Sequence, residues 1–109
     1  MSDIADTFLV IIKRLPEFQQ WLARLRDGRA VARIAERLER LRLGNPGDHK
    51  SVGKGVMELR VTYGPGYRVY YVQLGDVVIV LLCGGDKSTQ HADIRRAHEL
   101  AKELDDGQN

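Results

Sequence analysis

The sequence is poor in several residue types that mark large protein classes. Its 109 residues include a single cysteine, Cys83, three prolines and only 6% aromatic residues. One cysteine excludes a disulfide framework and a metal site built from several cysteines. No stretch approaches 18 consecutive apolar residues, so the sequence predicts no transmembrane helix. Acidic residues, Asp3 and Asp6, stand where a secretory signal carries bases, and we therefore expect a cytoplasmic protein.

The composition is that of an ordinary globular domain. Hydrophobic residues make up 43% and charged residues 29% of the chain. A chain of this length buries enough surface on folding for one hydrophobic core without help from metals or disulfides. We expect one domain over residues 1–109, with an ordered core over about residues 4–104.

A formal net charge of +2 hides an uneven distribution of charge. Residues 13–68 hold thirteen Lys and Arg against six Asp and Glu, whereas residues 1–12 and 69–109 are both net acidic. A basic middle segment favours an anionic partner that docks on one side of the molecule. Charge alone leaves a merely solvated basic surface equally open.

Hydrophobic periodicity predicts the element order β-α-α-β-β-β-α. Strands are expected over residues 7–12, 56–63, 67–74 and 77–83, and helices over about 16–26, 29–43 and 90–104. The first of these strands is also compatible with the start of a helix. Gly84-Gly85 is expected to end the last strand, and Ser88 or Thr89 to cap the last helix.

This order indicates an α+β fold with a mostly antiparallel sheet. The first two helices form a hairpin that packs on one face of the sheet, and the other face stays partly exposed beside the C-terminal helix. The last strand is apolar throughout, which is typical of a central strand covered on both faces.

The turn at residues 64–66 sets the register of the hairpin that follows. A three-residue loop pairs Tyr63 with Tyr67 and turns Arg68 away from the apolar face. A two-residue loop would instead bury the Arg68 guanidinium among apolar side chains, at a cost of several kcal/mol. We therefore expect the three-residue loop.

That register places Arg60, Arg68 and Tyr70 on one face. The two arginines become diagonal neighbours about 7–8 Å apart. Neighbouring guanidinium groups repel each other unless an anion bridges them, and their forked geometry suits a phosphate. The alternative is that Glu58, on the same face, pairs with one arginine in a purely structural bridge.

The connection over residues 47–55 is rich in glycine and basic residues. It is not a nucleotide-binding P-loop, because Lys54 is followed by Gly55 and a strand rather than by Ser or Thr and a helix. Lys50 and Lys54 are candidates to bind a backbone phosphate, and His49 to transfer a proton. A solvated connection is the alternative.

The segment over residues 84–89 joins a central strand to a helix, and such corners bind anions through exposed N–H groups and the helix dipole. Lys87 adds a fixed positive charge there. The alternative is that the glycines only let the chain turn. Cys83 is expected to be a buried thiol.

A stripe of arginines follows one side of the second helix. We expect it to be solvated and paired with neighbouring glutamates, with a partner protein as the alternative. Its members are Arg29, Arg33, Arg37 and Arg40.

Five short strings, in one order along the chain, resemble one protein family. They are Trp21-Leu22-x-x-Leu25, Gly44-Asn45-Pro46-Gly47-Asp48, Glu58-Leu59-Arg60, Gly64-Pro65-Gly66-Tyr67-Arg68-Val69-Tyr70-Tyr71 and Gly84-Gly85-Asp86-Lys87-Ser88-Thr89-Gln90. Together they resemble the addiction module killer (phage Gp49-like) branch of the RelE/HigB toxin superfamily, over about residues 4–104.

The resemblance implies the toxin of a type II toxin–antitoxin pair with a RelE-like fold. It implies an mRNA endoribonuclease that acts at the ribosome and inhibits translation, without a metal or a small-molecule cofactor. Its partners would be mRNA, the ribosome and a small antitoxin, often a helix-turn-helix protein. No membrane partner is expected.

By position, Arg60 and Arg68 match the family's sheet arginines, and Lys50 and Lys54 match its basic loop residues. Lys87 falls where relatives place a functional Tyr, His or Lys.

These positions suggest a division of labour. The arginines clamp the scissile phosphate, while Lys54 and Lys87 assist proton transfer. Tyr70, Lys50 and His49 contact the RNA. The competing functions are a ParE-like toxin that binds and inhibits DNA gyrase, and a non-catalytic relative that only binds nucleic acid.

Overall fold

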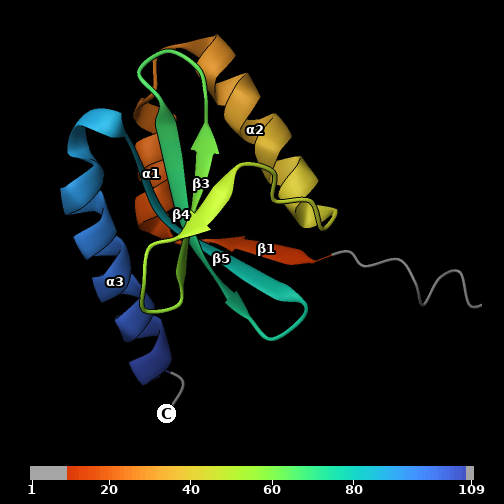
Figure 1. Ribbon diagram of the computed structural model, residues 1–109, viewed down its shortest axis with the longest axis vertical. Helices are drawn as coiled ribbons and strands as arrows, with labels where there is room; N and C mark the ends of the chain where they lie inside the picture. Colours follow the sequence, from red (N-terminus) through yellow and green to blue (C-terminus); the bar gives the residue numbers. More distant parts are fainter. Residues whose placement is uncertain (1–9, 108–109) are drawn as a thin grey trace, which may run out of the picture.

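A computed structural model describes residues 10–107 as a mixed α+β structure (Figure 1). Its elements are β1 (Ile11–Arg14), α1 (Pro16–Arg24), α2 (Gly28–Arg42), β2 (His49–Ser51), β3 (Val56–Val61), β4 (Tyr67–Leu74), β5 (Val78–Asp86), a short 3-10 helix η1 (Lys87–Thr89) and α3 (Gln90–Gly107). The five strands form one sheet in the order β1-β5-β4-β3-β2, in which only the β1–β5 pair is parallel.

Helices cover both faces of this sheet. On one face, Phe18 of α1 and Ile34 of α2 pack in one core with Leu59 and Leu81 of the strands. On the other face, α3 packs over a second core that contains Leu82 (Figure 1). The expected two-helix layer and the central apolar strand are therefore confirmed. α3 covers part of the face that we expected to be exposed.

The β3–β4 hairpin has the predicted face but not the predicted register. Val61 pairs with Tyr67, and Arg60 lies directly opposite Arg68. The connection therefore spans residues 62–66 rather than 64–66. The shift is by two residues, which preserves the face of each side chain because strand side chains alternate with period two.

One sequence expectation about β5 was wrong. Gly84-Gly85 does not end the strand, because β5 continues to Asp86 and keeps pairing with β4. The 3-10 helix η1, which was not predicted, then precedes α3 and is capped by Asp86, whose carboxylate accepts a hydrogen bond from the Ser88 N–H at 2.8 Å.

The sheet edges also differ from expectation. The strand β2, which pairs with β3, was predicted as part of a loop. β1 begins at Ile11 and continues to Arg14, two residues beyond the predicted end of the strand. Residues 7–9 of the predicted strand and residues 4–9 of the expected ordered core lie outside the described part of the chain.

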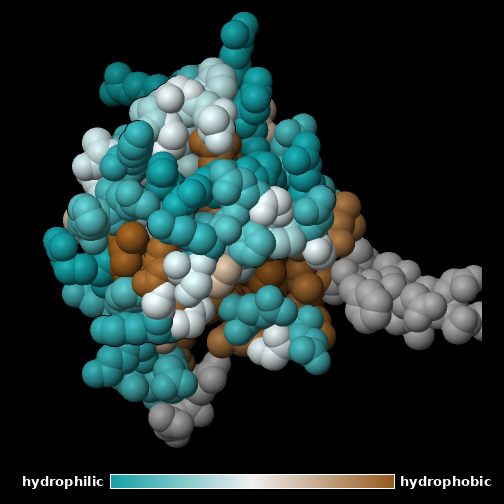
Figure 2. Space-filling view, viewed as in Figure 1, coloured by the Kyte–Doolittle hydropathy of each residue, from teal (hydrophilic) through white to brown (hydrophobic). Residues whose placement is uncertain are grey.

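The surface is hydrophilic over most of the view in Figure 2, with hydrophobic residues gathered near β1 and the β4–β5 hairpin. Ile11, Leu74 and Val77 are exposed large apolar residues at this end of the sheet. Over residues 10–107, no helix is long and apolar enough to cross a membrane.

Candidate functional site

Two arginines from adjacent strands form the centre of the candidate site. Arg60 of β3 and Arg68 of β4 are a directly opposed pair, and such Cβ atoms lie about 4.5–5.5 Å apart. The Arg60 side chain is 32% exposed and that of Arg68 is 13% exposed. The predicted arginine pair is therefore present, in a closer arrangement than the expected diagonal one.

Glu58 lies between these arginines and is completely buried. Its Oε1 accepts a hydrogen bond from Arg60 Nε at 3.0 Å, and its Oε2 lies 3.5 Å from Arg68 Nε. Oε2 also accepts hydrogen bonds from the Tyr70 hydroxyl at 3.0 Å and from Gln90 Nε2 at 2.8 Å. The structural bridge considered as an alternative is thus present, and it involves both arginines.

The ionised form of Glu58 is favoured despite its burial. Burial alone would raise the pKa of the carboxyl, but hydrogen bonds from Gln90, Arg60 and Tyr70, with the charge of Arg68, lower it below the ordinary value. With one carboxylate and two guanidinium groups, the cluster carries one net positive charge. This charge is equal in size and opposite in sign to the single negative charge of a phosphodiester.

Tyr70 is enclosed by the protein and is not presented on the open face of the sheet. Its side chain has no exposed surface, and its hydroxyl donates to Glu58. Burial and the adjacent Glu58 charge raise its pKa far above the ordinary value, so it stays a neutral donor. The sequence expectation failed because α3 covers this part of the face.

Two lysines lie around the arginine pair as predicted. Lys50 of β2 is paired with Glu58, so it lies on the same face of the sheet as the arginines and is exposed. Lys87, the second lysine, is placed by its position beside Gly66. A Cβ built on Gly66 would lie 3.3 Å from Arg68 Nη1 and 3.7 Å from Lys87 Cβ. Lys87 and Arg68 therefore flank the same glycine.

Two other predicted residues lie apart from this cluster. His49 pairs with Leu59, so it lies on the other face of the sheet from the arginines, and its Nδ1 lies 2.7 Å from the Gly47 carbonyl oxygen. Lys54 precedes β3, and the five residues from Val56 to Arg60 alone span about 13 Å. The structure thus does not bring these residues to the arginines.

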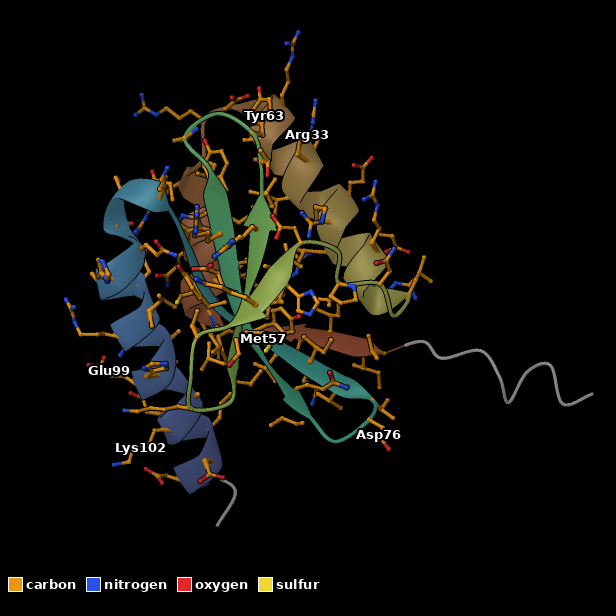
Figure 3. The ribbon with its side chains drawn as sticks, viewed as in Figure 1. Arg33, Met57, Tyr63, Asp76, Glu99 and Lys102 are labelled. Atoms are coloured by element: carbon orange, nitrogen blue, oxygen red, sulfur yellow. The ribbon has the colours of Figure 1, made fainter. Side chains whose placement is uncertain are left out.

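Lys54 instead lines a groove of about 650 Å³ between its turn, the end of β4 and α3. Glu99 and Lys102, labelled on α3 in Figure 3, line the same groove. The turn is tight, with positive φ at Gly53, Lys54 and Gly55.

Arg37 is the one member of the arginine stripe that is not a solvated side chain. Its Nη1 donates to the carbonyl oxygen of Arg60, and its Nη2 donates to those of Pro46 at 2.9 Å and Asp48 at 3.2 Å. It therefore ties the chain before β2 to the backbone of a site arginine. Its spacing along the helix is the same as that of its neighbours, so no pattern in the sequence distinguishes it.

The remaining arginines of the stripe are exposed, as expected. Arg40 lies 3.6 Å from Glu36, and the Arg33 guanidinium lies 5.1 Å from the ring centre of Tyr63 (Figure 3).

Gln90, the first residue of α3, is a site residue that was not predicted from the sequence. It reaches Glu58 across 32 residues of sequence, and no local pattern marks such a contact.

The single cysteine is buried as expected. Burial raises the pKa of the Cys83 thiol to about 12, so the reactive thiolate form is suppressed. In the part of the chain that the structure describes, no three His, Cys, Asp or Glu side chains are grouped so that they could hold a metal ion.

Comparison with known proteins places these residues in a family. Residues 16–104 match the family model described as "Phage derived protein Gp49-like (DUF891)". The matched range includes Glu58 and the four residues around its carboxylate, which are Arg60, Arg68, Tyr70 and Gln90.

A curated relative comes from Haemophilus influenzae (strain ATCC 51907 / DSM 11121 / KW20 / Rd). It is 52% identical over 93 residues, which are 85% of this chain and 94% of the relative. That relative is described as "Uncharacterized protein".

Proposed function

This chain belongs to the Gp49-like family of phage-derived proteins, and we propose that it is the toxin of a type II toxin–antitoxin pair. We further propose that it has the RelE-like fold and acts as a metal-independent endoribonuclease that cleaves mRNA at the ribosome. The proposed partners are mRNA, the ribosome and a small antitoxin protein. The opposed pair of Arg60 and Arg68 is the observation that carries this proposal.

The arginine pair suits the chemistry of RNA cleavage. The 2′-hydroxyl of RNA loses its proton to water and attacks the adjacent phosphorus, while the bond from phosphorus to the 5′-oxygen breaks and that oxygen takes up a proton. This leaves a 2′,3′-cyclic phosphate and a 5′-hydroxyl. Negative charge grows on the nonbridging oxygens during the attack, and prepositioned guanidinium groups stabilise that charge.

Proton transfer is assigned to Lys87 rather than to Glu58. All of the donors around the Glu58 carboxylate are supplied by the protein, and the group is inaccessible to RNA. Lys87 is exposed, and its Cβ flanks Gly66 together with Arg68 Nη1, which supports a role for its ammonium as the proton donor to the leaving 5′-oxygen. Lys50 contributes to phosphate binding from the neighbouring strand.

The test is mRNA cleavage by the Arg68→Ala variant, with ribosomes present and absent. We expect kcat/KM to fall by about 100-fold or more, because a preorganised charge is removed from the developing oxyanion. The control is Arg29→Ala, which removes the same charge from an exposed position of α2. Circular dichroism of both variants checks the fold.

A gyrase supercoiling assay on the wild-type protein provides the contrary outcome. Inhibition of supercoiling without RNA cleavage would replace the endoribonuclease by the ParE-like function. Equal RNA cleavage by the wild type and Arg68→Ala would remove Arg68 from the site.

A further inference from the structure

The two arginines present different edges to Glu58 and to solvent. Arg60 Nε donates a hydrogen bond to the buried carboxylate at 3.0 Å, whereas Arg68 Nε lies 3.5 Å from it as an ion pair without a hydrogen bond. Arg68 Nη1 donates to the Gly66 carbonyl oxygen at 3.0 Å. Within residues 10–107, the Nη atoms of Arg60 and Nη2 of Arg68 form no hydrogen bond. The Arg60 side chain is the more exposed of the two, at 32% against 13% for Arg68.

The carboxylate itself is fixed from two other elements. Tyr70 of β4 and Gln90 of α3 both donate to its Oε2, and neither side chain is needed to contact an RNA. A buried carboxylate with all of its donors in place has little freedom to rotate. It is therefore a rigid support for two long and otherwise flexible arginine side chains.

We propose that Glu58 is the positioning residue of this site. It holds Arg60 through a hydrogen bond at Nε and Arg68 through its charge, so that their Nη tips point together at one phosphate of an RNA. This inference rests on the proposed function and adds a residue that does not touch the substrate. It also explains how two like charges can lie directly opposite each other before any RNA is bound.

The Glu58→Gln variant tests the proposal, because it keeps the shape of the side chain and removes its charge. The amide NH₂ group then faces groups that are themselves donors. We expect kcat for RNA cleavage to fall about 100-fold, the size of effect that a 1 Å misplacement produces. KM for RNA should stay the same or decrease, since the site gains one positive charge.

A matched control is Glu36→Gln, which makes the same charge change at an exposed carboxylate near Arg40. Its kcat and KM should equal those of the wild type. A kcat for Glu58→Gln within about threefold of the wild type, in a folded protein, would overturn the proposal.

A milder variant decides the question if Glu58→Gln does not fold. Tyr70→Phe keeps the buried ring and removes one of the donors that fix the carboxylate. We expect kcat to fall about 10-fold with KM unchanged. An unchanged kcat would contradict the proposal, because it would show that RNA cleavage does not depend on how firmly the Glu58 carboxylate is held.

A readout without RNA separates this proposal from the proposed function. In nitrogen-15 NMR spectra of the wild type, the Arg60 Nε–H should be protected from exchange with water, and Glu58→Gln should lose that protection. Titration with inorganic phosphate should shift the Nη signals of both arginines in the wild type. If the wild type does not cleave RNA, the proposed function fails; if Arg60 Nε–H is equally protected in both proteins, the positioning role fails.

Discussion

Two adjacent glycines near the end of β5 let two helices approach the sheet from opposite sides. A Cβ built on Gly84 would lie 2.3 Å from Cε3 of Trp21 in α1. A Cβ built on Gly85 would lie 1.9 Å from Oδ2 of Asp93 in α3. Neither glycine has a positive φ, so the lack of a side chain, not an unusual backbone, is what these positions require.

Gly84→Ala should therefore destabilise the protein by about 1–3 kcal/mol, the cost of overpacking a close contact. Gly28→Ala is the control, since a methyl group at Gly28 would have nothing within 4 Å and the backbone there is helical. That variant should be neutral or stabilising by up to about 1 kcal/mol. Urea unfolding measures both, and equal midpoints for the two variants would contradict the steric explanation.

At the scale of elements, α2 is fixed at its start by a side-chain cap. The Asp27 carboxylate accepts hydrogen bonds from the N–H groups of Arg29 at 2.9 Å and Ala30 at 3.3 Å. Its other oxygen accepts from the Tyr63 hydroxyl at 3.2 Å, which joins the helix start to the hairpin loop.

Asp27→Ala should reduce the free energy of unfolding by about 1 kcal/mol, because it removes an N-cap. Asp27→Asn retains an oxygen acceptor and should reduce the free energy of unfolding by only a few tenths of a kcal/mol. Thermal or urea unfolding of the pair gives the comparison. A loss of the same size in both variants would assign the effect to the charge of Asp27 rather than to capping.

The connection before β2 is another element that a distant side chain supports. Arg37 reaches from α2 to the carbonyl oxygens of Pro46, Asp48 and Arg60, so β2 is held to the sheet edge from the helix layer. Lys50 on this strand depends on the same support. A three-residue strand of wholly exposed residues has no hydrophobic pattern by which it could be predicted from a sequence.

At the scale of the whole molecule, the Glu58 carboxylate joins β3, β4 and α3 through its partners Arg60, Tyr70 and Gln90. A second ion pair, between Glu17 of α1 and Arg96 of α3 at 2.8 Å, connects the helices around the end of the sheet. A hydrogen bond from Arg96 lowers the pKa of Glu17. Protonation of either carboxylate at low pH would therefore weaken a contact between different elements of the fold.

The part of the wild-type stability that Glu58 supplies should be complete above about pH 5 and be lost as the pH drops below about 4. Glu58 has a lower pKa in the folded than in the unfolded state, where an ordinary Glu has a pKa of about 4.3. Its contribution is thus complete above the unfolded pKa and is lost as the pH falls through the folded pKa. Each unit of difference corresponds to about 1.4 kcal/mol.

Urea unfolding between pH 2.5 and pH 7 measures this dependence. Glu58→Gln should be less stable at pH 7 and show a weaker fall toward low pH, with the remaining slope supplied by Glu17 and other carboxylates. An identical pH dependence in both proteins would show that Glu58 has the same pKa in the folded and unfolded states.

The hairpin shows how far local patterns reach. Alternation placed Arg60 and Arg68 on one face correctly, because that property survives a shift of two residues. It did not fix the register, because residues 62–66 form a longer connection than the glycines suggested. The residues of a turn do not by themselves determine how many flanking residues stay unpaired between the two strands.

The sequence by itself determined the α+β class, the order of the three α-helices and the four longer strands, and the presence of two arginines on one sheet face. These follow from hydrophobic periodicity and side-chain alternation, which are local properties. Only the tertiary structure decided that α3 buries Tyr70, that Glu58 and Gln90 join the arginines, and that His49 and Lys54 lie elsewhere. Such outcomes depend on which distant segments pack together. Burial and long-range hydrogen bonds arise only after the chain has folded.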